Sequence, residues 1–256
     1  MKDFWVGQAK EYGFDVKAIN FDPLEEELEL HFIKDLFKNG EKVCDFGCGN
    51  GRTLLNLARN NKSTEFYGID FVPDFIDIAN QQKDRMGLSN VHFLIANAGS
   101  KNLSRLFRFK FDRVLTKRLL INLKGKQRLI ALENIRSFLK SEGVYIMVEC
   151  FYMPLFKINC IRKSLGLEEI KVNEFNEYLS AGFLRQVQKT FEIKEKIDFE
   201  SLYYFISRIF NAYLSKGKPD YFANINKLAV TLSKAGLDNI IKGYSPQVIY
   251  ILKKIN

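Results

Sequence analysis

The sequence has no long hydrophobic run, only two histidines and only four cysteines among its 256 residues. No uncharged apolar stretch reaches the roughly 18–20 residues that a membrane-spanning helix needs. The first residues, MKDFWVGQAKEYGFD, carry scattered charges and no apolar core, which does not fit a signal peptide. Repeats and low-complexity segments are also missing. We therefore expect a cytoplasmic protein without a membrane span, built as one large domain or as a domain with a cap.

The scarcity of cysteine and histidine also argues against a metal centre. Cys44 and Cys48 lie four residues apart, but in a predicted strand and the loop after it. A zinc site needs closer cysteine pairs and further ligands, and the only histidines are His31 and His92. We expect reduced thiols, as is usual in a cytosolic protein, and no bound metal.

Positive charge is plentiful and unevenly distributed. The formal net charge is +9, and residues 101–128 contain ten lysines or arginines against one acid, Asp112. A basic surface attracts nucleic acid, anionic lipid or a phosphorylated small molecule. Solvated helix faces of a basic protein give the same composition, so the charge alone does not select a partner.

Short apolar segments alternate with helical patterns up to residue 150, which is typical of an α/β fold. Strands are expected at 43–47, 65–70, 91–97, 111–117 and 143–150. Helices are expected at 51–60, 73–86 and 124–139, with a turn at 141–143 before the fifth strand. Strands separated by helices form a parallel sheet covered on both faces, and right-handed crossovers make that sheet doubly wound.

The pattern changes after Cys150. Residues 154–190 look helical with breaks, helices are expected at 201–214 and 220–235, and late strands are expected at 191–199 and 246–254. We therefore expect a seven-stranded, mostly parallel sheet whose last strand is antiparallel, with a helical cap inserted after the fifth strand. The predicted units are an N-terminal lid at 1–40, a core at 41–150, a cap at 151–190 and 200–245, and the two late strands.

One motif carries chemistry. Asp45-Phe46-Gly47-Cys48-Gly49-Asn50-Gly51 follows the first predicted strand and precedes the first predicted helix of the core. Glycines at such a place allow positive φ and a close approach of a ligand to the backbone, and the helix N-terminus adds free N–H groups. Ligands of open parallel sheets bind beyond the carboxyl ends of the strands. The sequence thus predicts a ligand site at residues 45–51.

This loop resembles motif I of class I methyltransferases, of the form D-x-G-C-G-x-G, and differs from the G-x-G-x-x-G of dinucleotide-binding folds. The resemblance implies a Rossmann-like fold and S-adenosylmethionine as cofactor. It implies that Asp45 pairs with the amino group of the cofactor. It also implies that the backbone holds the methionine part, at Gly47, Cys48, Gly49 and Gly51.

The next strand ends supply adenosine contacts by the same resemblance. Asp70 ends the second strand and can accept hydrogen bonds from both ribose hydroxyls, and Phe71 follows it as a surface for adenine. Asn97 and Ala98 end the third strand. An aspartate is common there in the family, and the amide oxygen of Asn97 can accept the adenine amino group in its place. Each residue alone would also fit an ordinary turn, so it is their joint spacing that favours a binding site.

A wider resemblance covers nearly the whole chain with lower specificity. Residues 116–123 with Gln127, a strand ending at Glu149, and the segments 155–167 and 176–178 resemble a bacterial methyltransferase group found with surface-polysaccharide gene clusters. The start of the chain fits the same group as an aromatic lid over the cofactor, formed by Trp5 and Tyr12 among others. This resemblance indicates a group of enzymes and not a substrate.

Acceptor-binding residues are expected after the fourth strand and in the cap. Lys117 and Arg118 suit an anionic group, and Glu149 is a candidate for holding a hydroxyl or acting as a base. Arg118 would otherwise be a surface residue, and Glu149 a structural partner of Arg162. Aromatic residues at helical spacing in 201–214 fit core packing as well as a substrate wall. The substrate candidates are Asn122, Arg162, Tyr178, Tyr203, Tyr204 and Arg208.

Three functions fit these observations. The first is O-methylation of a small polar or anionic molecule in capsular or surface-polysaccharide synthesis, such as a sugar, a nucleotide-linked sugar, or a phosphate or phosphoramidate group. The second is methylation of RNA or DNA. The net charge supports it, but Thr116-Lys117-Arg118-Leu119 stands where amino-directed enzymes carry D-P-P-Y or N-P-P-Y. The third is a non-catalytic subunit that binds S-adenosylmethionine. The sequence does not indicate the oligomeric state.

Overall fold

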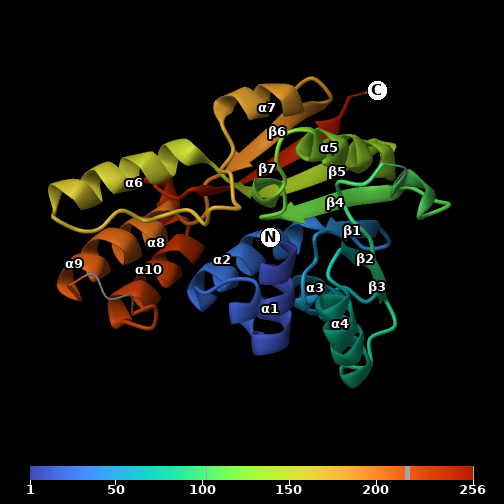
Figure 1. Ribbon diagram of the computed structural model, residues 1–256, viewed down its shortest axis with the longest axis horizontal. Helices are drawn as coiled ribbons and strands as arrows, with labels where there is room; N and C mark the ends of the chain where they lie inside the picture. The colour runs from blue at the N-terminus through green and yellow to red at the C-terminus, as the bar shows by residue number, and fades with distance from the viewer. Residues whose placement is uncertain (102, 217–219, 256) are drawn as a thin grey trace.

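The computed structural model describes residues 1–101, 103–216 and 220–255, and these residues form a seven-stranded sheet flanked by helices (Figure 1). The strand order is β3-β2-β1-β4-β5-β7-β6, and β7 runs antiparallel to both of its neighbours. The predicted fold class is confirmed. The strands are β1 (Lys42–Phe46), β2 (Glu65–Asp70), β3 (Val91–Ile95), β4 (Phe111–Lys117), β5 (Leu139–Cys150), β6 (Phe191–Ile197) and β7 (Gln247–Lys254).

Helices cover both faces of the sheet. Buried side chains of α5 and α7 share one hydrophobic cluster with the strands, and those of α2, α3, α4, α8 and α10 share the cluster of the opposite face. Within the described residues no helix is both long and apolar enough to cross a bilayer. The helices are α1 (Lys2–Tyr12), α2 (Pro23–Ile33), α3 (Arg52–Asn60), α4 (Pro73–Arg85), α5 (Lys126–Phe138), α6 (Tyr152–Ser164), α7 (Ala181–Val187), α8 (Ser201–Phe205), α9 (Ala212–Leu214) and α10 (Asn224–Lys234).

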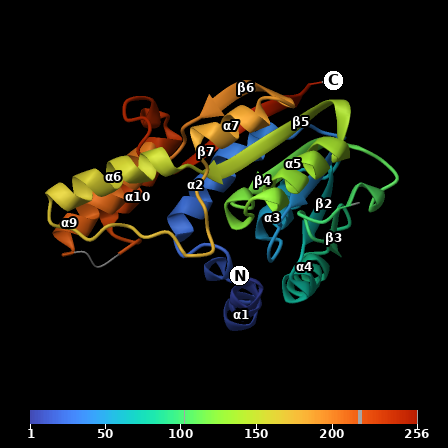
Figure 2. The same ribbon diagram turned by 45° about the horizontal axis from the view of Figure 1, so that its top comes forward.

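The strand order reverses at β1, which positions the site. β1 pairs in parallel with β2 on one side and with β4 on the other. The chain therefore leaves β1 and β4 toward opposite faces of the sheet, and a crevice opens beyond their carboxyl ends. The loop between β1 and α3 lies at this switch point, as the sequence predicted. Figure 2 shows α1 lying beyond the sheet on the side of α2 and α4.

The start of β5 differs from the expectation. Ser141–Gly143 were interpreted as a turn because such residues favour turns, but β5 already begins at Leu139, which pairs with Phe111. The register shifts between Phe111 and Arg113, so the extra residues form an irregularity within the strand. A Cβ at Gly143 would lie 2.9 Å from Leu139 Cβ, which explains the glycine at this position.

The expected cap divides into two parts. The segment 165–179 is largely irregular between α6 and α7, although the sequence indicated helix with breaks. The expected helix at 201–214 is α8, a π-helical segment (Ile206–Asn211) and α9. Side chains of α8 and α10 join the core cluster of the sheet, so this part of the cap shares the main core. α6, the π-helical segment and Tyr204 of α8 form a smaller cluster of their own.

Candidate cofactor and acceptor site

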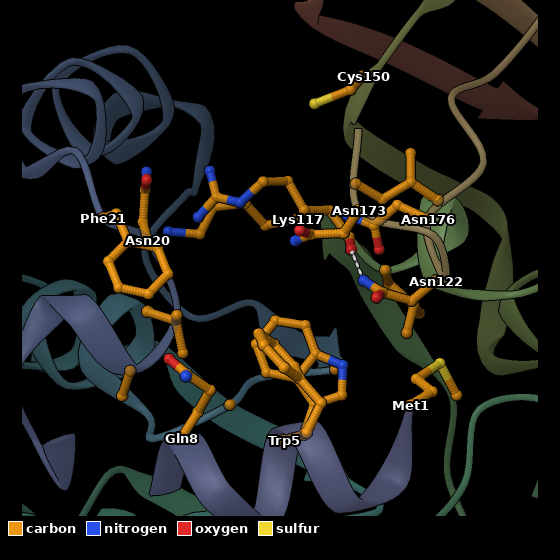
Figure 3. A pocket seen from close by; sticks show the side chains of 18 of the residues that line it. Met1, Trp5, Gln8, Asn20, Phe21, Lys117, Asn122, Cys150, Asn173 and Asn176 are labelled. Atoms are coloured by element: carbon orange, nitrogen blue, oxygen red, sulfur yellow. Dashed lines mark hydrogen bonds between the residues drawn. The ribbon is translucent and has the colours of Figure 1, made fainter. Parts of the chain in front are cut away.

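A cavity of about 630 Å³ lies beyond the carboxyl ends of β1, β2 and β4. Its lining comes from α1, the β1–α3 loop, the ends of five strands, the segment 170–178 and the π-helical segment. Figure 3 shows Trp5 and Gln8 pointing from α1 toward Lys117, with Asn20 and Phe21 on one side and Asn122, Asn173 and Asn176 on the other. The cavity thus brings together segments from both ends of the chain.

The β1–α3 loop forms one wall, and its glycines are required by geometry. Gly49 lines the cavity with φ +54°, and a Cβ there would lie 2.9 Å from Ile19 Cγ2. Gly51 has φ +78°, and its Cβ would lie 2.7 Å from Ala79 Cβ. L-residues rarely adopt these φ values, and the neighbours leave no room for a side chain. Both glycines therefore allow the close packing that places the loop backbone at the cavity wall.

Asp45 is a buried acid that lacks a partner. It lines the cavity at 2% exposure, and its Oδ1 atom has no hydrogen-bond partner among the described residues. Burial raises the pKa of Asp45 to about 8, Lys117 opposes that shift, and Asp70 adds to it. A buried acceptor without a donor is costly in a folded protein. The ammonium group of an amino-acid ligand would supply the missing donor.

Asp70 ends β2 with both carboxylate oxygens tied to the backbone. Oδ2 accepts the N–H of Gly49 at 3.0 Å, and Oδ1 accepts that of Val72 at 2.9 Å. Burial raises the pKa of Asp70, and these backbone bonds oppose the shift. Each oxygen keeps a second lone pair, and Asp70 lines the cavity beside Phe71. The arrangement fits the predicted ribose contacts.

The third strand end also lies at the cavity. Asn97 and Ala98 both line it. The Oδ1 atom of Asn97 accepts the N–H of Gly99 at 2.9 Å, so the amide oxygen that was expected to accept from adenine already closes a turn. One lone pair of that oxygen and the amide nitrogen stay available by the chemistry of the group. The adenine contact stays a prediction.

The N-terminal helix covers the cavity with aromatic side chains. Trp5 lines the cavity, and Phe4 contacts Phe175 of the segment 170–178 with ring centroids 4.7 Å apart. Tyr12, the second predicted lid residue, does not line the cavity. Its ring contacts that of Phe21 instead, with the ring centroids 6.0 Å apart. Seven residues of helix separate Tyr12 from Trp5 by roughly 10 Å along the axis, which carries it past the cavity.

Asn50 of the β1–α3 loop and Arg52, the first residue of α3, bind this lid, and neither was among the predicted site residues. Asn50 is fully buried, and its Nδ2 atom donates to the carbonyls of Gly13 and Asp15 at 3.0 and 3.2 Å. Arg52 donates to the carbonyl of Phe14 at 3.1 Å. The residues between and after the motif glycines therefore bind the lid to the cofactor loop. A polar side chain next to the motif glycines is the sequence feature that could have indicated this role.

Lys117 and Arg118 line the cavity as predicted, but both are ion-paired. The Lys117 Nζ atom lies 2.7 Å from Glu29 Oε2, and Arg118 pairs with the other oxygen of Glu29. Gln247 donates to Glu29 at 2.7 Å. Arg118 has φ +54°, a conformation that non-glycine residues retain where the surroundings enforce it. Glu29, which sequence reasoning missed, therefore fixes the orientation of both cations.

Glu149 does not line the cavity, and its predicted role as a base is not supported. It is fully buried, and its carboxylate accepts the backbone N–H groups of Leu119 at 3.0 Å, Leu120 at 2.9 Å and Ile121 at 3.4 Å. Burial raises the pKa of Glu149 to about 7, and these bonds oppose the shift. Glu149 thus shapes the turn that carries Arg118 and Asn122. Asn122 lines the cavity.

Arg162 is also outside this cavity, and it is not the partner of Glu149. It donates to the carbonyl of Glu168 at 2.7 Å and to that of Arg208, so it joins α6 to the π-helical segment. It borders a smaller neighbouring cavity of about 210 Å³ that shares Ile170, Arg208 and Tyr221 with the first. Sequence alone could not show that the guanidinium would cap backbone carbonyls.

Residues of α8 and the π-helical segment lie partly in the core and partly at the cavity. Tyr203 is fully buried and donates to Asp22, whereas Tyr204 and Arg208 line the cavity. Arg208 pairs with Asp22 at 2.7 Å, and its guanidinium lies over the rings of Tyr204 at 4.9 Å and Tyr221 at 5.3 Å. Tyr203 was thus wrongly placed among the substrate candidates. Tyr178 lines the cavity as predicted.

Several cavity residues had no signal in the sequence. They lie far along the chain from the motif, and their types are common elsewhere on the surface. Asp22 was visible only as the start of a helix, since Asp-Pro is a usual N-cap and first-turn pair. The missed lining residues include Asp22, Glu25, Cys150, Tyr221 and Gln247. Neither His31 nor His92 lines the cavity.

Comparison with known proteins agrees with this geometry. A family model described as a methyltransferase domain matches residues 37–194. The chain is 42% identical over 53 residues to the tRNA (guanine-N(7)-)-methyltransferase of Synechococcus sp. (strain JA-3-3Ab), which is 21% of this chain and 22% of that protein. The chain thus spans only about a fifth of that relative's length.

Solved structures share the fold. YjhP from E. coli superposes with a TM-score of 0.58 and 17% identity over 98% of this chain and 99% of that one. Geranyl diphosphate C-methyltransferase from Streptomyces coelicolor A3(2), solved with S-adenosyl-L-homocysteine, superposes with a TM-score of 0.58 and 14% identity. The match covers 90% of this chain and 76% of that one. Because the family model covers more than half of the chain, the chain belongs to the methyltransferase domain family, and S-adenosylmethionine is the cofactor that fits the cradle around Asp45 and Asp70.

Proposed function

We propose that this protein is a methyltransferase that modifies an oxygen of a small, polar acceptor carrying an anionic group. The observation that carries the proposal is the continuity of one cavity from the glycine loop to Arg118 and Arg208. When bound, S-adenosylmethionine supplies an activated methyl group. The chain itself binds and aligns the acceptor and excludes water, which are the main contributions a protein makes to such a displacement.

The two arginines are suited to hold the anionic group. Arg118 contacts Glu29 and Gln247, and Arg208 contacts Asp22 and Ser207. A guanidinium has five N–H donors, so both retain donors for a ligand. Because buried acids already fix their orientation, little side-chain freedom is lost when an anion binds. A phosphate or carboxylate is the matching group.

Surface-polysaccharide synthesis is the setting that we propose. The support is the resemblance of residues 116–123, 155–167 and 176–178 to a bacterial methyltransferase group of such gene clusters. A sugar, a nucleotide-linked sugar, or a phosphate or phosphoramidate group of a glycan precursor would combine polar hydroxyls with an anion. Such precursors are made in the cytoplasm, where we expect this protein.

Methylation of nucleic acid is the alternative, and the placement of the basic residues disfavours it. Within the basic stretch 101–128, Arg113 pairs with Glu41 at 2.7 Å. Arg128 is buried and donates to the carbonyls of Leu120 and Leu123. Lys117 and Arg118 face the enclosed cavity. These four cations are used inside the fold and are unavailable to a phosphate backbone.

Incubation with labelled S-adenosylmethionine tests the proposal. The acceptor panel contains nucleotide-activated sugars, sugar phosphates, capsule fragments and RNA. We expect label in a phosphorylated or carboxylated small molecule, and a KM for it that rises about tenfold or more in Arg118→Gln, because a charge-assisted contact is lost. Arg113→Gln, which removes an ion-paired arginine outside the cavity, is the matched control and should leave KM unchanged.

Two results would overturn this function. Label in RNA alone would replace the small acceptor by a nucleic acid. Failure of the wild-type protein to bind S-adenosylmethionine in a calorimetric titration would remove the enzyme assignment itself.

A further inference from the structure

The N-terminus of α2 contains a glutamate that is not used in the usual way. Asp22 is the N-cap, and its Oδ1 atom accepts the N–H groups of Leu24 at 3.1 Å and Glu25 at 3.3 Å. A glutamate three residues after an N-cap commonly returns a hydrogen bond to the N-cap N–H. Here the Oδ1 atom of Asn20 accepts that N–H at 3.0 Å instead. The carboxylate of Glu25 is thereby free of a capping role.

Glu25 instead lines the cavity without a cationic partner. Its hydrogen bond is from Asn20 Nδ2 to Oε2 at 3.1 Å, and across the described ranges of the chain no basic side chain lies within 4.0 Å of it. The neighbouring acids are paired at 2.7 Å: Asp22, the N-cap of α2, with Arg208, and Glu29, which lies outside the cavity lining, with Lys117. Glu25 is therefore the unmatched acid on this side of the cavity.

The environment makes that unmatched charge unfavourable. Burial raises the pKa of Glu25, Asp22 adds to the shift, and Arg208 and Arg118 lower it without forming an ion pair. An enclosed carboxylate needs a donor or a cation to offset its desolvation. A ligand can supply one, just as the cofactor ammonium would for Asp45.

The charges on the acceptor side also constrain the ligand. Lys117, Arg118 and Arg208 form ion pairs with two acids, Glu29 and Asp22, and Glu25 lies beside this network without an ion pair. An anion that binds the arginines adds negative charge next to Glu25 and the two paired acids. A ligand that also carries a positive charge avoids part of that cost.

We propose that the acceptor is a zwitterion whose anionic group contacts Arg118 and Arg208 and whose protonated amine contacts Glu25. This inference rests on the proposed function and adds the second recognition group. A protonated amine has no lone pair to attack a methyl group, so it serves recognition, and the methylated oxygen lies elsewhere in the acceptor. Glu25 is then a specificity-determining residue, and no covalent step passes through it.

A pair of isosteric probes tests this by calorimetry, with the protein saturated with S-adenosylhomocysteine. The first is O-phosphoethanolamine, and the second is 2-hydroxyethyl phosphate, in which a hydroxyl replaces the ammonium. We expect the first to bind the wild-type protein about tenfold more tightly, as a charge-assisted contact gives. In Glu25→Gln the two affinities should become equal.

Glu26→Gln is the matched control for this experiment. Glu26 lies in the same helical turn and pairs with Arg52 at 3.2 Å, away from the cavity lining. This variant should keep the tenfold preference, because only a charge outside the cavity is lost. Affinity for S-adenosylhomocysteine should be unchanged in both variants, which shows that they are folded.

Several results would overturn the inference. These are equal affinities for the two probes in the wild-type protein, a preference that persists in Glu25→Gln, or no binding of either probe. If Glu25→Gln does not bind S-adenosylhomocysteine, Glu25→Ala replaces it, and loss of that binding in both variants would make Glu25 a structural residue. If wild-type protein does not bind S-adenosylhomocysteine, the proposed function fails first, which separates the two failures.

Discussion

The two halves of the cavity are built in different ways. The donor half comes from short stretches at the ends of adjacent strands, 45–51, 70–71 and 97–98, and it presents backbone atoms and carboxylates with open lone pairs. The acceptor half is built from side chains far apart in the chain, such as Arg208 with Asp22 and Gln247 with Glu29, which are 186 and 218 residues apart.

In the proposed function, this difference separates binding of the methyl donor from selection of the acceptor. A ligand that must always be the same is recognised by a local strand–loop–helix unit, whose geometry follows from glycine and the strand ends. The acceptor side depends on pairs such as Arg118 with Glu29, which can be exchanged without moving the glycine loop. The donor half leaves Asp45 without a partner until its ligand binds, whereas the acceptor half satisfies most of its own charges.

The largest effect is expected from Gly51→Ala in the donor half. The backbone at residue 51 has φ +78°, and the added Cβ would lie 2.7 Å from Ala79 Cβ and 2.8 Å from Phe93 Cζ. We expect a loss of about 3 kcal/mol in the free energy of unfolding, from backbone strain and overpacking together. Urea denaturation measures it. Gly87→Ala, at φ +62° with open space around it, should lose only about 1 kcal/mol, and equal losses would contradict the packing argument.

Asp45→Asn should weaken cofactor binding next most strongly. The variant removes a carboxylate whose Oδ1 atom has no hydrogen-bond donor among the described residues. We therefore expect the affinity for S-adenosylmethionine to fall by roughly 30- to 100-fold, as for a lost charge-assisted contact. Calorimetry measures the change. Asp112→Asn, which removes a carboxylate that pairs with Lys140 at 2.6 Å away from the cavity, is the control. An unchanged affinity in Asp45→Asn would exclude it from the donor site.

The same residue should make stability depend on pH. The pKa of Asp45 is raised from the usual 3.8 to about 8 in the ligand-free fold, mainly by burial. The folded state therefore holds this proton more tightly than the unfolded state, and stability falls as pH rises from about 4 to about 8. Asp45→Asn should remove this slope and be more stable than the wild type at pH 8. Urea titrations at pH 5 and pH 8 test it, and parallel profiles for the two proteins would refute it.

Phe175→Ala should have the smallest effect and tests whether the lid joins the two halves. Phe175 belongs to the segment 170–178 and contacts Phe4 and Trp5 of α1 at 4.7 and 6.2 Å. Loss of these aromatic contacts should cost about 1 kcal/mol of lid closure and speed release of S-adenosylhomocysteine about fivefold in stopped-flow measurements. Phe109→Ala, whose ring packs on Tyr67, should not change that rate. The same rate in both variants would show that the lid contact does not retain the cofactor.

The sheet, the switch-point loop and most of the donor side could be predicted from the amino-acid sequence. The expected strands 65–70 and 111–117 coincide with β2 and β4, because each contains a short run of buried residues next to a segment with helical spacing. Of the predicted cofactor residues, only Tyr12 and Gly51 lie outside the cavity lining. The burial of a strand and the backbone conformation of a glycine depend on residues that are close in the sequence, so both can be predicted from a few neighbouring residues.

Which charged and polar side chains meet could be seen only in the folded chain. It placed Glu149, Arg162 and Tyr203 in structural contacts and brought Glu25 and Gln247 to the cavity. The bulge at the start of β5 and the π-helical segment that carries Arg208 were equally invisible in the sequence. Hydrogen bonds and ion pairs act over about 3 Å, and groups some 200 residues apart reach that distance only after the sheet and its helices have packed.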